Sequence, residues 1–310
     1  MKIKILGTGL TGLVGSRIVE LLSDHCEFEN LSLETGVDIT NREQVKKRIV
    51  DSPARVILHL AAKTDVDGCE NDREKDIKIL KNNDFDQQKN IWQKEKTAWW
   101  INVEGTKNIV AAAKKSNKKM IYISTDFIFD GTKDFYDEND IPNPVNWYGV
   151  TKYEGEKIIR KSGLSFLICR IAFPYRAKFA LRKDFLRGIL EKLQAGQKLS
   201  LVKDEIITPT FIDDIANALD FLINKKATGI YHVVGSSSHT PLEIAYSITR
   251  LFSLDKELIS ETTRDLYFSG RASRPFSLIL KNDKLKKLGI TMSVFTDGLN
   301  KIKSQLLISN

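Results

Sequence analysis

The sequence predicts an α/β fold in which a doubly wound parallel sheet carries a smaller, interleaved C-terminal region. Short runs rich in isoleucine, valine and leucine alternate with stretches whose apolar residues recur every three to four positions. Nearly continuous apolar runs are typical of strands buried on both faces, and their alternation with helical patterns indicates βαβ units. A glycine-rich turn directly after the first run is typical of the point where such a unit passes from strand to helix.

The expected elements follow in order along the chain. Strands are expected at residues 2–6, 31–33, 55–60, 119–124 and 164–171, with helices between them, for example at 13–22 and 103–113. After about residue 172 the pattern loosens into a helix at 179–194, an extended piece at 208–212, a helix at 213–223 and a buried strand at 229–234. Helical patterns follow at 242–252, 283–288 and 298–307. We therefore expect a first domain over residues 1–172, to which residues 211–235 return, and a substrate-binding region over 173–310.

The composition is that of an ordinary globular protein and excludes several other classes. Of 310 residues, 42% are hydrophobic and 28% are charged, with 48 lysines and arginines against 40 acids and a formal net charge of +8. No apolar run reaches the roughly 18–20 residues that a membrane-spanning helix needs, and glycine breaks the N-terminal run too early for a secretory signal. Cys26, Cys69 and Cys169 are too far apart for a disulfide framework or a metal site. We expect a cytoplasmic protein with no metal and no membrane partner.

The mild positive charge does not indicate a nucleic-acid-binding protein. Basic and acidic residues alternate over most of the chain, and no basic stripe with interleaved aromatic residues is present. One basic cluster has few acids beside it and is better suited to a phosphorylated ligand. It consists of Arg176, Lys178, Arg182, Lys183 and Arg187.

Residues 70–98 form an irregular segment with seven acids, seven bases and scattered apolar residues. One interpretation is a solvated helical or loop insertion at the sheet edge. The other is a lid or partner-contact element, because long insertions in compact domains are often functional. Trp92, Trp99 and Trp100 are the candidates to anchor this insertion to the body of the protein.

The turn after the first strand carries three glycines at every third residue, directly before an apolar-periodic helix. Residues without a side chain let the chain turn sharply, let the backbone approach a pyrophosphate and let the helix pack closely on the strand. The phosphates then meet the N–H groups and the positive end of the helix dipole. We expect a Rossmann-like NAD(P)-binding domain. Its expected contacts in this turn are Gly9, Thr11, Gly12, Leu13, Val14 and Gly15.

An acid near the end of the second strand normally binds the adenosine ribose. Glu34 lies 19 residues past Gly15, close to the usual spacing of about 20. A carboxylate there repels a 2′-phosphate and favours NAD(H). Arg17, Arg42 and Lys63 offer compensating charge, so NADP(H) stays the alternative coenzyme.

Two later strands end in small or polar residues. The third is followed by Ala61, Ala62 and Thr64, which let a coenzyme ribose lie against the backbone, and the fourth ends at Thr125 and Asp126. Ligands of open α/β folds bind at the carboxyl edge of the sheet. We therefore expect these residues to contact coenzyme and substrate.

Tyr148 and Lys152 are four residues apart and share one face of a predicted helix. A free tyrosine has a pKa of about 10 and is a poor acid–base catalyst at neutral pH, whereas a nearby ammonium favours the phenolate and lowers that pKa. Thr125 can hold the reacting oxygen by a hydrogen bond. Because the pair follows a glycine turn and a Ser-Thr-Asp strand end, we expect Thr125, Tyr148 and Lys152 to be catalytic.

Together these motifs resemble the extended short-chain dehydrogenase/reductases. Within that superfamily they are most similar to the dTDP-4-dehydrorhamnose reductase family, which includes the regulatory subunit of methionine adenosyltransferase. The matching stretches run in family order from residue 3 to about 290. They are Thr8-Gly9-x-x-Gly12-x-x-Gly15, Asp38-Ile39-Thr40, His59-Leu60-Ala61-Ala62, Asn102-Val103-Glu104-Gly105-Thr106, Ser124-Thr125-Asp126-x-x-Phe129-Asp130-Gly131, Pro144-x-x-x-Tyr148-Gly149-x-x-Lys152-x-x-x-Glu156, Pro209-Thr210, Asp213-Asp214-Ile215-Ala216 and Arg274-Pro275.

The resemblance implies hydride transfer between NAD(P)H and the C4 keto group of a sugar nucleotide, and it is compatible with a homodimer. Tyr148 would supply the proton, and Lys152 would bind the nicotinamide ribose. Thr125 and Asp126 would contact the substrate. Asn102 is similar to the family's asparagine that supports a proton-relay water, with an ordinary helix residue as the alternative.

The resemblance also places Asp38 and Ile39 beside the adenine. After the fifth strand the reductases usually have Ser-Trp-Val-Tyr-Gly, where this chain has Ala172-Phe173-Pro174-Tyr175-Arg176. The aromatic residue is kept as Phe173, which we expect to contact the substrate, and the glycine is lost.

Two other functions stay open at this point. One is a sugar-nucleotide epimerase or dehydratase, although a dehydratase would want a glutamate after Asp126, where this chain has Phe127. The other is a cofactor-binding regulatory subunit of reductase fold that performs no catalysis. The presence of Thr125, Tyr148 and Lys152 argues against it, because a pure binder has no need of all three.

Overall fold

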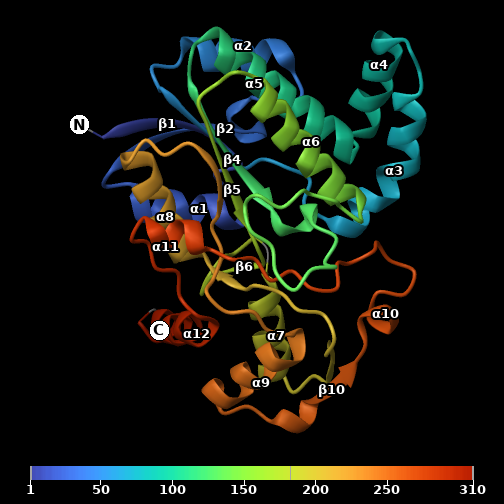
Figure 1. Ribbon diagram of the computed structural model, residues 1–310, viewed down its shortest axis with the longest axis vertical. Helices are drawn as coiled ribbons and strands as arrows, with labels where there is room; N and C mark the ends of the chain where they lie inside the picture. Colours follow the sequence, from blue (N-terminus) through green and yellow to red (C-terminus); the bar gives the residue numbers. More distant parts are fainter. Residues whose placement is uncertain (1, 182, 309–310) are drawn as a thin grey trace.

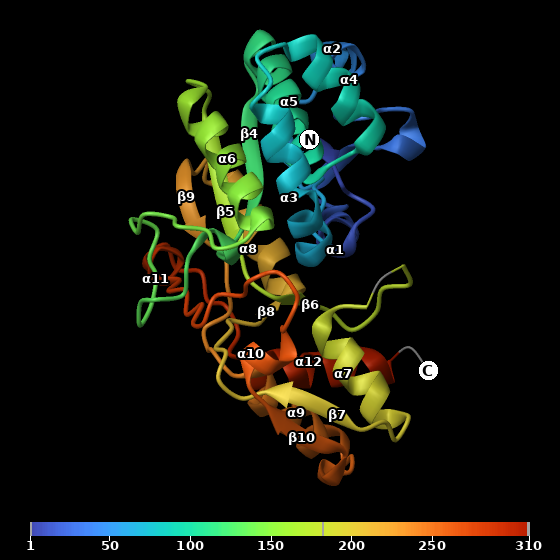
Figure 2. The same cartoon turned by 90° about the vertical axis from the view of Figure 1, so that its right-hand side faces the viewer.

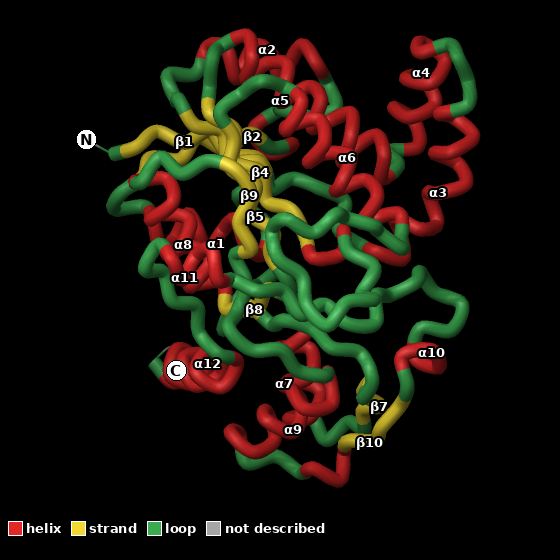
Figure 3. Tube along the Cα trace, viewed as in Figure 1, coloured by secondary structure: helices red, strands yellow, loops and turns green. Residues whose placement is uncertain are grey.

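The computed structural model describes residues 2–181 and 183–308, and its central feature is a six-stranded parallel sheet. The strands lie in the order β2-β1-β3-β4-β5-β9. Several of them are labelled in Figures 1 and 3. Their bounds are β1 Ile3–Thr8, β2 Cys26–Leu31, β3 Val56–His59, β4 Lys119–Thr125, β5 Phe166–Ile171 and β9 Gly229–His232. Every neighbouring pair is parallel, so the predicted doubly wound α/β fold is confirmed.

Helices cover both faces of this sheet (Figure 2). Successive strand residues point to opposite faces, so Ile5 faces the core under α1 and α8, and Leu6 faces the core under α2, α5 and α6. The bounds of these helices are α1 Leu13–Leu22, α8 Ile212–Asn224, α2 Arg42–Asp51, α5 Gly105–Lys115 and α6 Trp147–Lys161. Burial on both faces is the reason why the strands read as continuous apolar runs.

A second group of elements lies below the sheet in Figure 1. It has its own core around Phe295 and two short parallel ladders, β7 with β10 and β6 with β8. The bounds are β6 Pro174–Tyr175, α7 Phe185–Gln194, β7 Leu199–Val202, β8 Thr210–Phe211, α9 Pro241–Phe252, β10 Ile259–Thr262, α10 Arg264–Tyr267 and α12 Phe295–Leu307. The short helix α11, Asp283–Lys287, packs instead against β9 and the sheet core through Leu285. Between these elements the chain returns to the sheet through α8 and β9. The exact boundary at residue 172 stays a prediction.

Two expected elements were misplaced. The second strand was expected at residues 31–33 but occupies Cys26–Leu31, and a 3₁₀ turn, Leu33–Thr35, follows it. This strand is an edge strand, so its polar residues Glu27 and Glu29 hid the apolar pattern. The helix expected from residue 179 begins only at Phe185, because the Asp184 side chain caps it by accepting from the Arg187 amide.

The 70–98 segment is part of a helical hairpin of α3 (Val66–Leu80) and α4 (Phe85–Glu95) beside α6 (Figure 1). The helical interpretation is right, but the inner face of α3 is buried rather than solvated, with Cys69, Asp76 and Ile79 inside. Trp92 stacks on Trp100 with ring centroids 5.8 Å apart. Within residues 2–181 and 183–308, no helix combines the length and apolar character needed to cross a membrane.

Candidate active site

The glycine turn lies between β1 and α1. Gly9 has φ +69°, and a Cβ there would lie 2.7 Å from the Ala61 amide nitrogen. A Cβ on Gly15 would overlap the Gly9 carbonyl oxygen. Gly12 is the N-cap of α1 and offers no side-chain cap, so the first-turn N–H groups are left for another acceptor. The turn therefore fits a pyrophosphate, which supplies acceptors for these N–H groups and takes the space that a side chain would fill.

This turn lies at the switch point of the sheet, where β1 neighbours both β2 and β3. Thr8 connects the two strand ends, because its Oγ1 accepts from the Ala61 amide at 3.2 Å and lies 2.6 Å from His59 Nδ1. His59 is fully buried, and burial together with the Lys152 charge lowers its pKa to about 3. A neutral imidazole thus bridges Thr8 and Thr106, whose Oγ1 lies 3.0 Å from Nε2.

Glu34 lies in the exposed 3₁₀ turn just beyond the carboxyl end of β2. Two of the three cations expected to offset its charge are engaged elsewhere. Arg17 makes a bidentate pair with Asp213 at 2.7 Å for both contacts, and Lys63 pairs with Asp72 at 2.6 Å. Near this end of β2, the Asp38 carboxylate is partly used, because Oδ1 accepts from the Thr40 amide and hydroxyl.

Asn102 connects the loop after β3 to α6 from within a π-helix, Trp100–Glu104. Its Oδ1 accepts from the Lys63 amide at 2.7 Å, and its Nδ2 donates to the Lys63 carbonyl at 3.0 Å and to Thr151 Oγ1 at 2.9 Å. Thr151 in turn donates to the Tyr148 carbonyl at 2.9 Å. The Asn102 side chain is therefore a structural link as well as the predicted support of a relay water, and π-turns of this kind are frequent at functional sites.

Lys152 is on the buried face of α6 and is 3% exposed. Its Nζ donates to the Ile123 carbonyl of β4 at 2.8 Å. Its Nζ also lies 4.0 Å from the centre of the Tyr122 ring. Burial lowers the pKa of Lys152 to about 7, although Glu156 acts in the opposite direction. Tyr122 carries no sequence signal that would have singled it out, because it reads as one more apolar residue of β4.

Tyr148 occupies the first turn of α6 and is 9% exposed. Its ring meets the Phe127 ring edge-on at 5.9 Å, and Phe127 lies 6.0 Å from Phe173. Phe173 has φ +38°, a left-handed backbone conformation that costs energy for a bulky residue. Backbone strain of this kind is often found at functional sites. Thr11 and Thr64, two of the predicted coenzyme contacts, are exposed to solvent, in contrast to the buried Tyr148.

Thr125 and Asp126 lie where β4 ends. Thr125 Oγ1 donates to Asp126 Oδ1 at 3.0 Å, while Asp126 Oδ2 is buried without a hydrogen-bond partner in the described part of the chain. Burial raises the pKa of Asp126 to about 7. Glu205, 4% exposed in the loop after β7, also has its pKa raised to about 7, by burial first and by Asp126 in part, against the lowering effect of Arg274. No motif marks Glu205, so sequence reasoning missed it.

Asp126→Asn should remove a pH-dependent loss of stability. The folded pKa of about 7 lies above the ordinary 3.8, so the contribution of Asp126 to stability is complete below about pH 4 and is lost as the pH rises to 7. One proton corresponds to about 1.4 kcal/mol per pH unit. Urea unfolding at several pH values should show the free energy of unfolding of the variant rising relative to that of the wild type as the pH increases from about 4 to 7. A stability difference that stays flat would contradict the raised pKa.

The basic cluster expected to take a phosphorylated ligand is largely paired internally. Arg176 bonds Ser16 at 2.9 Å and Glu20 at 2.9 Å on α1, and Lys183 pairs with Glu191. Arg187 binds Asp184 at 2.8 Å. Arg182 lies outside the described residues.

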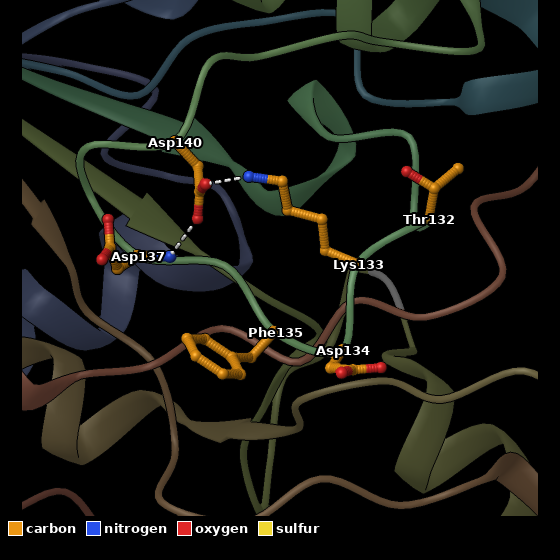
Figure 4. A pocket seen from close by; sticks show the side chains of 6 residues that line it. All are labelled: Thr132, Lys133, Asp134, Phe135, Asp137 and Asp140. Atoms are coloured by element: carbon orange, nitrogen blue, oxygen red, sulfur yellow. Dashed lines mark hydrogen bonds and ion pairs between the residues drawn. The ribbon is translucent and has the colours of Figure 1, made fainter.

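A surface hollow of about 430 Å³ lies in the loop after β4, and none of the residues that line it is a predicted site residue (Figure 4). Lys133 pairs there with Asp140, which also accepts from the Asp137 backbone amide at 2.7 Å. Across residues 2–181 and 183–308, no three His, Cys, Asp or Glu side chains are grouped to hold a metal.

The fold, the glycine turn at the switch point and the Tyr148–Lys152 helix define the class of extended short-chain dehydrogenase/reductases. The chain belongs to the family described as RmlD substrate binding domain, which matches residues 1–90 and 84–307. This confirms the resemblance drawn from the sequence.

Individual relatives agree with this assignment. The chain is 28% identical to a probable low-salt glycan biosynthesis reductase, Agl14, of Haloferax volcanii, covering 94% of each protein. It is also 28% identical to the bovine methionine adenosyltransferase 2 subunit beta, over 93% of this chain and 83% of that protein. The crystal structure of dTDP-4-dehydrorhamnose reductase from Bacillus anthracis in complex with NADP superposes with a TM-score of 0.85 at 26% identity, covering 98% of this chain and 100% of that one.

Proposed function

We propose that this protein is an NAD(P)H-dependent reductase of the keto group of a sugar nucleotide, with Tyr148 as the proton donor. The observation that carries the proposal is the buried face of α6, where Tyr148 and Lys152 lie one turn apart beside the β4 end that bears Thr125. All three residues are at most 9% exposed. A tyrosine and a lysine that merely share the solvent-facing surface of a helix would be more exposed. The likeness to NADP-bound and glycan-pathway reductases supports the same class.

The coenzyme would be held along the carboxyl edge of the sheet. The glycine turn would take the pyrophosphate, the β2 end with Glu34, Asp38 and Ile39 would take the adenosine, and Ala61 and Ala62 would face a ribose. A bound nicotinamide supplies the hydride that reduces the carbonyl carbon. The remaining chemistry falls to side chains of this chain.

Tyr148 would donate its phenolic proton to the oxygen that becomes an alkoxide, and Thr125 would hold that oxygen by a hydrogen bond. The tyrosine is left as a phenolate and recovers its proton from solvent. Lys152, with its pKa lowered to about 7, carries part of its charge at neutral pH. An ammonium at that place stabilises the phenolate and eases the proton's departure.

The substrate end of the site would use Asp126 and Phe173. An Asp126 carboxyl that holds its proton to about pH 7 is both a donor and an acceptor for sugar hydroxyls. Phe173 would lie against the apolar face of the sugar, beside Phe127. A nucleotide sugar is the substrate class that the named reductase relatives favour.

A regulatory, non-catalytic role is the second candidate, because the bovine methionine adenosyltransferase subunit matches 93% of this chain and the Agl14 reductase 94%, both at 28% identity. An epimerase or dehydratase is less favoured. Phe127 stands where a dehydratase would want a glutamate, and its ring is used in packing against Tyr148.

A panel of keto sugar nucleotides tests the proposal. Each is mixed with the purified protein and NADH or NADPH, and the absorbance of the reduced nicotinamide is followed. We expect consumption with at least one 4-keto sugar nucleotide. Coenzyme binding without consumption across the panel would overturn the reductase and favour the regulatory role.

The coenzyme preference can be tested at Glu34. The wild type should use NADH better than NADPH, because Arg17 and Lys63 are engaged with other acids. Glu34→Gln removes the repulsion of a 2′-phosphate and should raise the NADPH-to-NADH ratio of kcat/KM by roughly three- to tenfold, as expected for one exposed charge pair. Glu27→Gln, near the start of β2 and away from the turn that holds Glu34, is the control and should leave the ratio unchanged. An unaltered ratio in Glu34→Gln would contradict the assignment.

A further inference from the structure

Asp76 is a buried carboxylate that the proposed mechanism does not use, and it lies at the contact between α3 and the active-site helix α6. Its side chain is 0% exposed. Oδ1 accepts from Trp92 Nε1 at 3.0 Å and from Thr97 Oγ1, and Oδ2 accepts from the Trp99 amide at 3.1 Å and from Trp147 Nε1 at 2.8 Å. All four donors are uncharged groups.

The fourth donor belongs to the residue directly before Tyr148. The Trp147 amide also donates to Glu70 Oε2 at 2.7 Å, so both N–H groups of Trp147 end on carboxylates of α3. The Trp147 ring stacks on Trp99 with centroids 5.8 Å apart and planes inclined by 27°. The first turn of α6 is thereby fixed at two points, one residue away from the phenol.

A carboxylate is a costly way to join helices. Burying a charge carries a large desolvation penalty, and well-packed apolar side chains often give equal or better stability. A carboxylate with four donors fixes each donor to a narrow range of distance and direction, which apolar contacts do not. Its negative charge near the N-terminus of α6 also interacts favourably with the helix dipole.

We propose that Asp76 is a positioning residue for Tyr148, acting through the Trp147 indole. The proposal rests on the reductase function proposed above. The α3–α4 hairpin then helps to position Tyr148. Helix α4 supplies Trp92, and the chain after it supplies Thr97 and Trp99, as donors to the same carboxylate. Misplacement of a catalytic group by about 1 Å can cost roughly 100-fold in rate, so a small movement of this turn is sufficient to matter.

Asp76→Asn tests this directly. The amide keeps the shape of the side chain, but its nitrogen cannot accept a hydrogen bond, so the donors that face it lose their partner. We expect kcat to fall about 10- to 100-fold, while KM for the sugar nucleotide and the Kd for NADH stay within about twofold. Glu74→Gln, on the exposed face of α3, is the matched control and should leave kcat, KM and melting temperature unchanged.

Trp147→Phe is a second variant that tests the hydrogen bond between Trp147 and Asp76. It keeps an aromatic ring to stack on Trp99 and removes only the indole N–H, so kcat should fall while coenzyme binding is retained. The Asp76→Asn/Trp147→Phe double variant should be no slower than Asp76→Asn alone, because both changes break one interaction.

The outcomes separate the two proposals. A melting temperature lowered in Asp76→Asn with kcat unchanged per folded molecule, or losses that multiply in the double variant, would overturn the positioning role alone. If Asp76→Asn does not fold, Trp147→Phe decides, and an unchanged kcat there overturns the role. Absence of turnover in the wild-type chain would overturn the reductase function itself, and the positioning role with it.

Discussion

Tyr148→Phe is expected to lower kcat by roughly 100- to 10,000-fold, the range that a positioned general acid contributes. The phenylalanine keeps the edge-on packing against Phe127 and removes only the hydroxyl. The alkoxide formed by hydride addition then has no proton donor at its oxygen. Coenzyme affinity should change by no more than a few-fold, because the glycine turn and the β3 loop are untouched.

Tyr153→Phe is the matched control on the same helix. Its side chain is partly exposed beside Lys157, one turn beyond Tyr148, and its hydroxyl has no part in the proposed reaction. We expect turnover close to that of the wild type. Turnover preserved in Tyr148→Phe would show that another group supplies the proton.

Glu156→Gln should lower the free energy of unfolding by about 3–5 kcal/mol, the usual cost of removing one partner from a buried ion pair. Glu156 on α6 and Arg170 on β5 form a bidentate pair at 3.0 and 2.8 Å, with side chains 0% and 1% exposed. Glutamine keeps the shape, but it leaves the Arg170 guanidinium charged and buried without its counter-charge.

Glu154→Gln is the comparison for that variant. Glu154 lies on the same helix and pairs with Lys157, but both side chains are about one-third exposed, so its loss should cost less than about 1 kcal/mol. Urea unfolding of the three proteins measures both effects. Equal stabilities for the two variants would mean that the buried pair does not hold α6 to the sheet.

The parts of the fold that could be predicted from the sequence are those written in local patterns. Gly9, Gly12 and Gly15 mark a turn whose spacing is itself the signal, and the structure gives Gly9 and Gly15 a steric reason, since a Cβ on either would clash with backbone atoms. The central strands β1, β3, β4 and β5 are buried on both faces, so their apolar runs were readable. The edge strand β2 has polar residues at intervals, and its position was wrong by several residues.

The candidate site was predictable only where residues that lie close together in space are also close together in the sequence. Tyr148 and Lys152 share a helix face, so four-residue spacing was enough to pair them. Asp76 and Glu205 could not be found this way, because their partners come from segments far away in the chain and no motif connects them. The long-range hydrogen bonds to Asp76 and the buried environment of Glu205 exist only in the folded chain, and the sequence carries no local pattern for them.

Calorimetric titration of the purified protein with NADH and NADPH tests the central claim most directly. The account predicts saturable binding of at least one of them with one site per chain. It also predicts loss of binding in Gly12→Val, where the added Cβ would have one neighbour within 4 Å, the Gly9 carbonyl oxygen at 3.2 Å, and the side chain would compete with a pyrophosphate for the turn. The Gly12 backbone is extended, so valine can adopt the same backbone conformation, and the Gly9 carbonyl need move only by a few tenths of an ångström. No heat of binding with either coenzyme, or equal binding by Gly12→Val, would contradict a coenzyme at the glycine turn.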